Sequence, residues 1–344
     1  MHEAIQAVVE AAVHGEDSSR EAVEAAFAAL MDGEADPVDV AALLTSLAAK
    51  GESVDDLAAA ASVMAERVTP IHSHHQRLLD TCGTGGDRLH TFNISTATAI
   101  VAAACGVPGA KHGNRSVSSS SGSSDVLTAL GVTIDLPPES VASCLDEIGI
   151  GFCFAPLFHS AMKHAAGVRQ QLGIRTIFNL VGPLTNPAAA ACQLLGGNSN
   201  ATARLLAGAL GRLGRPRALV VCGNNELDEV ALWGTTLALE VDGGTGKITE
   251  HTWPADDFGL ASCEVSSLRV ESPEASAAMI RDVLEGQAGP GRDVVVANTA
   301  AALVAYGETT DLAEAARRAE ATIDQGRSAE QLAALVEVSQ RLAG

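Results

Sequence analysis

The chain of 344 residues is 47% hydrophobic and only 3% aromatic, so it can bury one large or two ordinary cores built from Ala, Val, Leu and Ile. Its formal net charge of −20 disfavours a nucleic-acid or acidic-membrane partner for the surface as a whole. No apolar stretch reaches membrane-spanning length, and seven scattered cysteines without a Cys-x-x-Cys pair are typical of a reduced, cytoplasmic protein.

The first part of the chain, to about residue 70, is predicted to form a small helical domain. Apolar residues recur at helical spacing from Ile5 onward. Helix-start signals follow at Ser18 or Ser19, where Ser18-x-x-Glu21 fits a capping box, at Asp36-Pro37 and at Ser53. We expect this domain to serve assembly or to act as a lid, because it carries little catalytic chemistry.

The segment His72-Ser-His-His75 raises the question of a metal site. No Cys or carboxylate adjoins it to complete a tetrahedral set of ligands. We therefore interpret it as a polar connection between the helical domain and the first strand.

A glycine-dense turn, Cys82-Gly-Thr-Gly-Gly-Asp87, lies between a predicted strand at 77–81 and a predicted helix at 97–105. This layout directs backbone N–H groups and the positive end of a helix at phosphate. It is not the dinucleotide fingerprint, because the third glycine would fall on Arg88, and the chain has no Walker A loop. The turn is thus predicted to be a phosphate loop of another kind.

The stretch from Lys111 to Asp125 combines two cations, Lys111 and Arg115, with an amide and a run of hydroxyls. Such donors form an anion site, and the alternative is a solvated Ser/Gly linker. The segment from Arg77 to Arg175 holds seven basic and seven acidic residues, so the whole −20 lies outside it. We interpret the stretch as a second anion loop, between a strand near 106–110 and a helix at about 124–130.

The remaining elements continue to alternate, which predicts an α/β domain with a central, mainly parallel sheet flanked by helices. They are helices at 139–148, 158–172 and 201–213, strands at 150–154, 217–222, 237–241 and 248–252, a helix from Pro273, a strand at 293–296 and closing helices to 342. Asp228 and Glu229 follow the strand at 217–222, where Mg²⁺ is commonly held, although an acidic turn is the alternative. Arg169 is either a site residue or an exposed helix cation.

Several motifs, in this order and spacing, resemble those of the anthranilate phosphoribosyltransferase family: Gly83-Thr-Gly-Gly-Asp87, Asn93-Ile-Ser-Thr96, Lys111-His-Gly-Asn-Arg115, Ser118–Asp125 and Arg175–Pro187. The match spans nearly the whole chain. This family of glycosyltransferases joins anthranilate to phosphoribosyl pyrophosphate (PRPP) in tryptophan biosynthesis. The resemblance implies a helical domain of residues 1–70, completed near 160–185, hinged to an α/β domain of residues 76–158 and 188–344. It also implies homodimers formed through the helical domains.

The resemblance further implies the roles of individual residues. PRPP is expected to bind Gly83, Gly86, Asp87, Thr91, Asn93, Ile94, Ser95, Thr96, Lys111, His112, Gly113, Asn114, Arg115, Ser118, Ser119 and Ser123. Anthranilate is expected to contact Gly83, His112, Asn114, His159 and Arg169, with Arg169 facing its carboxylate. Mg²⁺ is expected at Ser95, Asp228 and Glu229, and the catalytic residues are Lys111, Asn114 and Arg169, with no general base.

Three residues depart from the family pattern, namely Ser160, Cys222 and Glu226, and they flank the anthranilate wall and the metal loop. Two other functions fit a fold of this kind. A pyrimidine nucleoside phosphorylase would bind a nucleoside and inorganic phosphate instead. A homologue that has lost catalysis and binds nucleic acid is disfavoured by the net charge of −20.

Overall fold

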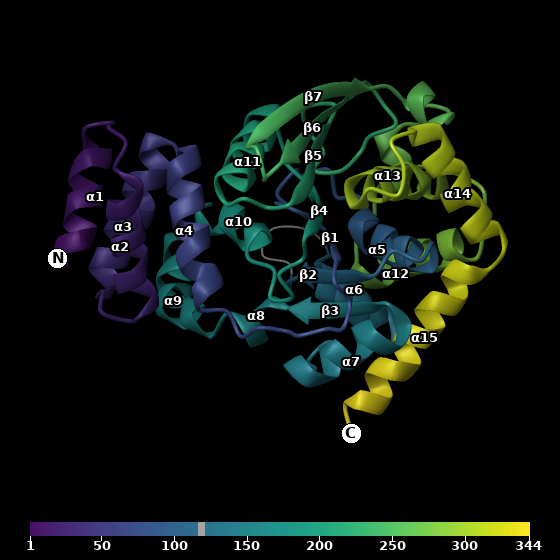
Figure 1. Ribbon diagram of the computed structural model, residues 1–344, viewed down its shortest axis with the longest axis horizontal. Coiled ribbons are helices and arrows are strands. Elements are labelled where there is room, and N and C mark those ends of the chain that lie inside the picture. The colour runs from purple at the N-terminus through teal and green to yellow at the C-terminus, as the bar shows by residue number, and fades with distance from the viewer. Residues whose placement is uncertain (116–120) are drawn as a thin grey trace.

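The computed structural model describes residues 1–115 and 121–344, and it places a helical domain at one end of a larger α/β domain (Figure 1). The helical domain consists of α1 (Glu3–Val13), α2 (Arg20–Met31), α3 (Pro37–Lys50) and α4 (Val54–Glu66). A later helix, α9 (Lys163–Leu172), packs against α2 and α3. The predicted combination of a helical N-terminal domain with an α/β domain is confirmed.

The helices of this domain begin at the predicted signals, with one correction. Asp36 caps α3 by accepting the N–H groups of Val38 and Asp39, and Ser53 opens α4 with a capping box. The capping box predicted at Ser18 is wrong. The alternative cap, Ser19, is confirmed, and it places Glu21 at the second helical position rather than the third.

In the described residues the strands form one seven-stranded sheet in the order β3-β2-β1-β4-β5-β6-β7. The strands are β1 (Leu79–Gly83), β2 (Gly109–Gly113), β3 (Ile150–Phe154), β4 (Cys192–Gly196), β5 (Arg217–Gly223), β6 (Thr236–Asp242) and β7 (Lys247–Trp253). Neighbouring strands from β3 to β5 are parallel, and β6 and β7 add an antiparallel edge. Every residue of β3 and β4 is buried, as expected of parallel strands with helices on both faces.

Helices cover the two faces of the sheet with separate apolar clusters. Strand residues alternate between them, so that Leu194 and Val221 belong to one cluster and Leu195 and Val220 to the other. The first face carries α5 (Ile94–Ala104), α6 (Ser123–Leu130), α12 (Pro273–Leu284), α13 (Pro290–Tyr306), α14 (Leu312–Asp324) and α15 (Arg327–Leu342). The second carries α10 (Phe178–Val181) and α11 (Asn200–Arg212), and its cluster continues into the helical domain.

The two domains therefore share a packed boundary, where α4 lies against α11. Gly208 of α11 permits this approach, since a Cβ there would stand 2.7 Å from a methyl carbon of Val54. At the opposite end of the sheet from β7, α7 (Pro138–Ile148) packs on the edge strand β3.

Three expectations about secondary structure need correction. The strand predicted at 293–296 is wrong, because these residues lie inside α13, which is buried on nearly all sides and overrides the strand preference of its valines. The second strand begins at Gly109, so Lys111, His112 and Gly113 belong to β2 itself. The helix predicted at 158–172 is broken at His159 into α8 (Ala155–Phe158), the 3₁₀ turn Ser160–Met162, and α9.

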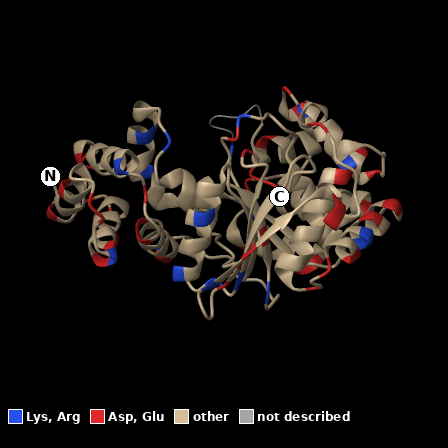
Figure 2. Cartoon of the chain, turned by 90° about the horizontal axis from the view of Figure 1, so that it is seen from above, with Lys and Arg blue, Asp and Glu red and all other residues tan. Residues whose placement is uncertain are grey.

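The surface and the connections also bear on the sequence interpretation. Acidic side chains are spread over the helices of both domains (Figure 2). No helix among the described residues has the length and apolarity that a membrane crossing requires. In the segment 72–75, His74 pairs with Asp146 at 3.1 Å and the His75 ring contacts the carbonyl of Leu145, as expected of a polar connection.

Candidate active site

The carboxyl ends of β1, β2 and β5 meet at one edge of the sheet and open into a cleft of about 330 Å³. Its other wall comes from α9 and from residues 175–183, which include the short helix α10. The following predicted residues line it: Gly83, Gly86, Asp87, Thr91, Asn93, Ile94, Ser95, Lys111, His112, Gly113, Asn114, Arg115, Ser123, Arg169, Asp228 and Glu229. The fold thus brings together residues that are up to 146 positions apart, from Gly83 to Glu229.

Four predicted residues are placed otherwise. Ser118 and Ser119 lie outside the described residues. Thr96 is fully buried, because successive residues of a helix point about 100° apart, so that Ser95 faces the cleft and Thr96 turns into the core. His159 is buried behind His112 and reaches the cleft only through it.

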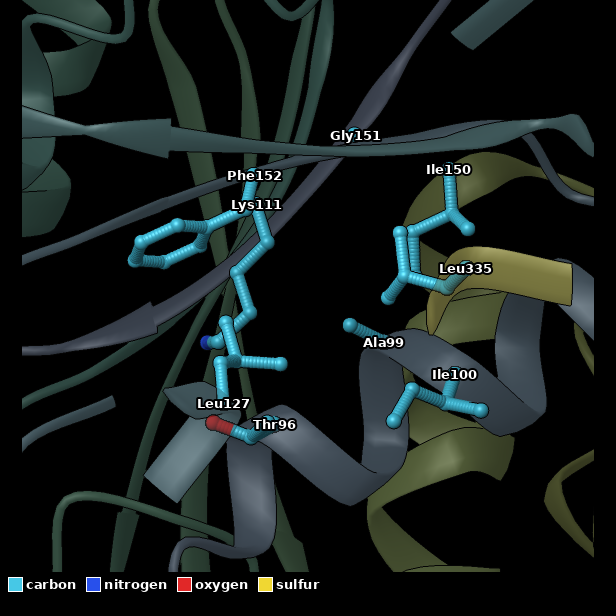
Figure 3. Close-up of a pocket in the computed structure, with 9 residues that line it drawn as sticks. All are labelled: Thr96, Ala99, Ile100, Lys111, Leu127, Ile150, Gly151, Phe152 and Leu335. Carbon is cyan, nitrogen blue, oxygen red and sulfur yellow. The ribbon is translucent and has the colours of Figure 1, made fainter. Parts of the chain in front are cut away.

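Thr96 faces a much smaller cavity of about 10 Å³ beside the stem of Lys111 (Figure 3). Its other walls are apolar side chains of α5, α6, β3 and α15, namely Ala99, Ile100, Leu127, Ile150, Phe152 and Leu335. This volume holds at most one water molecule. The larger cleft is therefore the candidate substrate site.

Asp228 and Glu229 follow β5 and reach across to two other elements. An Asp228 Oδ2 atom accepts the Gly85 N–H at 2.7 Å, and a Glu229 Oε1 atom accepts the Ser95 N–H at 3.0 Å. Burial raises the pKa of Asp228 to about 7, helped by the charge of Asp87, and raises the pKa of Glu229 to about 8, helped by Asp228. Ionisation of this buried pair is therefore costly unless a cation lies beside it.

Two glycines make room for this pair. A Cβ on Gly196 of β4 would stand 1.5 Å from the backbone oxygen of Asp228, and one on Gly83 would stand 2.2 Å from its Oδ2 atom. Both strands therefore need glycine at their last residue for Asp228 to enter the cleft.

Lys111 is the buried cation behind the acidic pair, with 4% of its surface exposed. Its ammonium donates to the carbonyl of Thr81 at 2.7 Å and to the Ser95 hydroxyl at 3.2 Å. Burial lowers the pKa of Lys111, and the buried carboxylate of Asp80 opposes that effect. Lys111 and Glu229 therefore both contact Ser95, Lys111 through the hydroxyl and Glu229 through the backbone N–H.

These donors fit Mg²⁺ in one particular way. The described residues contain no group of three or more His, Cys, Asp or Glu side chains able to hold a metal ion. Two buried carboxylates and the Ser95 hydroxyl form a partial set of oxygen ligands. Mg²⁺ is usually bound in this manner, by one or two carboxylates, with substrate phosphates and water completing the octahedron.

The opposite wall of the cleft carries Arg169, a cation without a charged partner among the described residues. Burial lowers its pKa, and its guanidinium lies 5.1 Å from the centre of the Phe178 ring. A half-buried, unpaired guanidinium above an aromatic ring is suited to receive the carboxylate of an aromatic ligand.

His112 and His159 form a buried pair whose Nε2 atoms lie 3.2 Å apart. Burial lowers the pKa of His112 to about 3, helped by the neighbouring His159, and lowers the pKa of His159 to about 4. Both rings are therefore neutral at neutral pH, one donating and the other accepting the shared proton. They give the cleft a wall that is polar and uncharged.

The sequence interpretation missed Arg175 as a site residue. Its guanidinium donates to the carbonyls of Gly85 at 3.0 Å and Thr84 at 3.4 Å, and so ties the glycine loop to the opposite wall. Phe178, Asn179, Gly182 and Pro183 of the same segment also line the cleft. Arg175 begins the motif Arg175–Pro187, which resembles the family pattern. Local sequence rules predict only an irregular backbone for this motif and give Arg175 no role in the site.

Comparisons with known proteins place the chain among enzymes. The glycosyl transferase family, a/b domain, matches residues 75–329, and the glycosyl transferase family, helical bundle domain, matches residues 6–68. An anthranilate phosphoribosyltransferase from Moorella thermoacetica is 47% identical over 332 residues, which cover 96% of this chain and 97% of that protein.

Solved structures agree with these matches. The anthranilate phosphoribosyltransferase from Thermus thermophilus has a TM-score of 0.90 at 41% identity, covering 97% of this chain and 99% of that one. The enzyme from Saccharomyces cerevisiae, solved in complex with PRPP and Mg, has a TM-score of 0.89 at 24% identity over 99% of both chains, a likeness of fold.

Proposed function

This chain belongs to the anthranilate phosphoribosyltransferase family, and we propose that it transfers the phosphoribosyl group of PRPP to the amine of anthranilate, releasing pyrophosphate. This reaction makes it a pentosyl-transferring enzyme of tryptophan biosynthesis. The observation that carries the proposal is the composition of one cleft. A glycine loop, a buried lysine and an acidic pair form one wall, and the unpaired Arg169 forms the other.

PRPP occupies the first wall. The glycine loop and the start of α5 offer backbone N–H groups and a positive helix end to its phosphates. The residues assigned to it are Gly83, Gly86, Asp87, Thr91, Asn93, Ile94, Ser95, Lys111, His112, Gly113, Asn114, Arg115 and Ser123. The assignment extends to Ser118 and Ser119 from the family pattern, but not to Thr96, whose side chain turns into the core. Lys111 stabilises the charge that develops on the departing pyrophosphate.

Mg²⁺ is the cofactor, held by Ser95, Asp228 and Glu229 together with the phosphates of PRPP. When bound, it supplies positive charge that stabilises the leaving group. The raised pKa values of both carboxylates support this role, because burial makes their ionised forms costly and a bound cation would offset that cost.

Anthranilate enters on the other wall. Arg169 binds its carboxylate, Asn114 and Gly83 border the aromatic ring, and the neutral His112 lines the tunnel with His159 buried behind it. The amine of anthranilate is already neutral, so alignment with C1 of the ribose matters more than a strong base. No general base is assigned.

Loss of anthranilate fluorescence on addition of PRPP and Mg²⁺ tests the proposed reaction directly. The wild-type protein should consume anthranilate only when all three components are present. A folded protein that leaves the fluorescence unchanged, but cleaves a pyrimidine nucleoside in inorganic phosphate, would instead be a nucleoside phosphorylase of this fold.

The domain division and the assembly are proposed on the same basis. Residues 1–70 with 160–185 form the helical domain, and residues 76–158 and 188–344 form the α/β domain. The helical domains join two copies into a homodimer, as the family resemblance implies. Light scattering of the purified protein measures the dimer. We place the enzyme in the cytoplasm, in keeping with seven free cysteines.

A further inference from the structure

The segment between β5 and β6 carries both carboxylates of the candidate metal site, yet little of it is regular structure. It opens with Asn224 and Asn225 at φ values of 49° and 57°, and it is closed by a bridge between Gly223 and Leu227. Beyond Leu227 the segment lacks a strand partner in the described residues. The position of Glu229 therefore depends on what holds the backbone that follows it.

The Thr236 hydroxyl of β6 pairs with Ala231, and Asn298 of α13 holds Val230, the residue next to Glu229. The Asn298 Oδ1 atom accepts the Val230 N–H at 2.8 Å, and its Nδ2 atom donates to the Val230 carbonyl at 2.9 Å. The second Nδ2 hydrogen is donated to the carbonyl of Val294, one helical turn earlier, at 2.8 Å. The amide thus pairs with both peptide groups of Val230, as a neighbouring strand would, and fixes the peptide that leaves Glu229.

Full burial makes this arrangement demanding. Asn298 has no exposed surface and Val230 has none either. A buried N–H or carbonyl without a partner is costly, so each of these groups needs the other. A leucine at position 298 would fill the space and would leave both peptide groups of Val230 unpaired.

Helix α13 also supports the opposite side of the metal site. It packs directly on α5, whose first turn contributes Ser95. The Ser95 N–H donates a hydrogen bond to a carboxylate oxygen of Glu229 across the site at 3.0 Å. One helix therefore contacts both α5, which carries the Ser95 hydroxyl, and the backbone beside Glu229.

We propose that Asn298 is a positioning residue for the magnesium site, which holds Glu229 in reach of Ser95 by pairing with both peptide groups of Val230. The inference rests on the proposed function of this cleft. It adds that a residue outside the cleft, on the far side of the acidic segment, determines the affinity for the metal. Side chains that orient metal ligands in this way typically change metal affinity about 10- to 100-fold when replaced.

The test compares two replacements of Asn298 with a matched control. Asn298→Asp keeps the acceptor for the Val230 N–H and loses both donors, whereas Asn298→Leu loses all three hydrogen bonds. Thr299→Val is the control, because Thr299 is the next buried residue of α13 and its hydroxyl has no partner among the described residues. Binding of Mn²⁺ in the presence of PRPP is measured by electron paramagnetic resonance, with Mg²⁺ as competitor.

Both Asn298 variants should weaken Mn²⁺ binding about tenfold or more, with leucine the weaker binder, while Thr299→Val binds as the wild type does. The KM for anthranilate at saturating Mg²⁺ should change less than about twofold in the aspartate variant. Folded variants that bind Mn²⁺ normally would overturn the inference. So would failure of both variants to fold, because Asn298 would then be needed for the fold as a whole.

The wild-type protein separates this inference from the proposed function. If the wild type binds no Mn²⁺ in the presence of PRPP and consumes no anthranilate, the proposed function fails. If the wild type does both and the Asn298 variants match it in Mn²⁺ affinity, only the positioning role fails.

Discussion

Replacing Arg169 with alanine is expected to weaken anthranilate binding selectively. Arg169 is partly desolvated and lacks an ion-pair partner among the described residues, so its charge is available to a ligand. A charge-assisted hydrogen bond to a carboxylate contributes about 1.5–3 kcal/mol. Since about 1.4 kcal/mol corresponds to a tenfold change in affinity, the KM for anthranilate should rise roughly 10- to 150-fold.

Initial rates of anthranilate consumption, followed by fluorescence, measure this effect. One series varies anthranilate at saturating PRPP and Mg²⁺, and the other varies PRPP at saturating anthranilate. Lys163→Ala is the matched control, since Lys163 is an exposed cation at the start of the same helix, α9. The control should leave both constants near the wild-type values.

A similar rise in the KM of both substrates would refute the assignment of Arg169 to the anthranilate carboxylate. So would an unchanged KM for anthranilate combined with a lower kcat, because that result would place the interaction in the transition state alone. Arg169→Lys should fall between the wild type and alanine, since it keeps the charge and loses the paired donors.

Three further results are expected. Asp228→Asn together with Glu229→Gln should raise the Mg²⁺ concentration required for turnover at least about tenfold, because both carboxylate ligands are lost. The same double variant should raise the melting temperature of the metal-free protein, because two buried carboxyl groups that repel each other when ionised are removed. His112→Gln should reduce acid sensitivity, because burial holds the pKa of His112 at about 3 in the folded protein, whereas an exposed histidine of the unfolded chain has a pKa of about 6.5. The contribution of His112 to stability is therefore full above about pH 6.5 and falls as the pH drops. Denaturation at pH 7 and pH 5 should show the wild type losing about 2 kcal/mol more than the variant. Gly86→Ala should raise the KM for PRPP at least about tenfold, because alanine is strained at the φ of 77° that Gly86 adopts, and a Cβ there would stand 1.8 Å from an Arg175 nitrogen and displace the guanidinium from the loop.

Local sequence signals predict those elements whose ends are set by their own residues. Strand β3 was predicted at the observed residues, 150–154, because Gly149 ends the preceding helix in a left-handed conformation and the strand is continuously buried. Helices α3 and α4 begin at Asp36 and Ser53 for the same reason, since each cap is contained in the chain next to the helix.

The candidate site was predictable only in part. Glycines after β1 and carboxylates after β5 indicate an anion and a metal site at the same edge of a parallel sheet, but local pattern does not say which residues meet there. The individual roles followed from the family resemblance. His159 illustrates the limit, because its contact with His112 depends on a break in a helix that periodicity predicts to be continuous.

Helix α13 shows how a wrong prediction and an informative signal can share one stretch of sequence. Its valines at 294–296 favour a strand, and only burial on nearly all sides makes them helical. Within that apolar helix, Asn298 is fully buried, and a buried amide is tolerated only with partners for its three hydrogen bonds. The burial of Asn298 therefore requires an internal polar partner, which the sequence alone does not reveal. The sequence does not identify Val230, which lies 68 residues away, because the folded sheet brings the acidic segment to α13. Burial thus makes the valines of α13 helical against their strand preference, and it also requires Asn298 to pair with Val230, through which Asn298 positions Glu229.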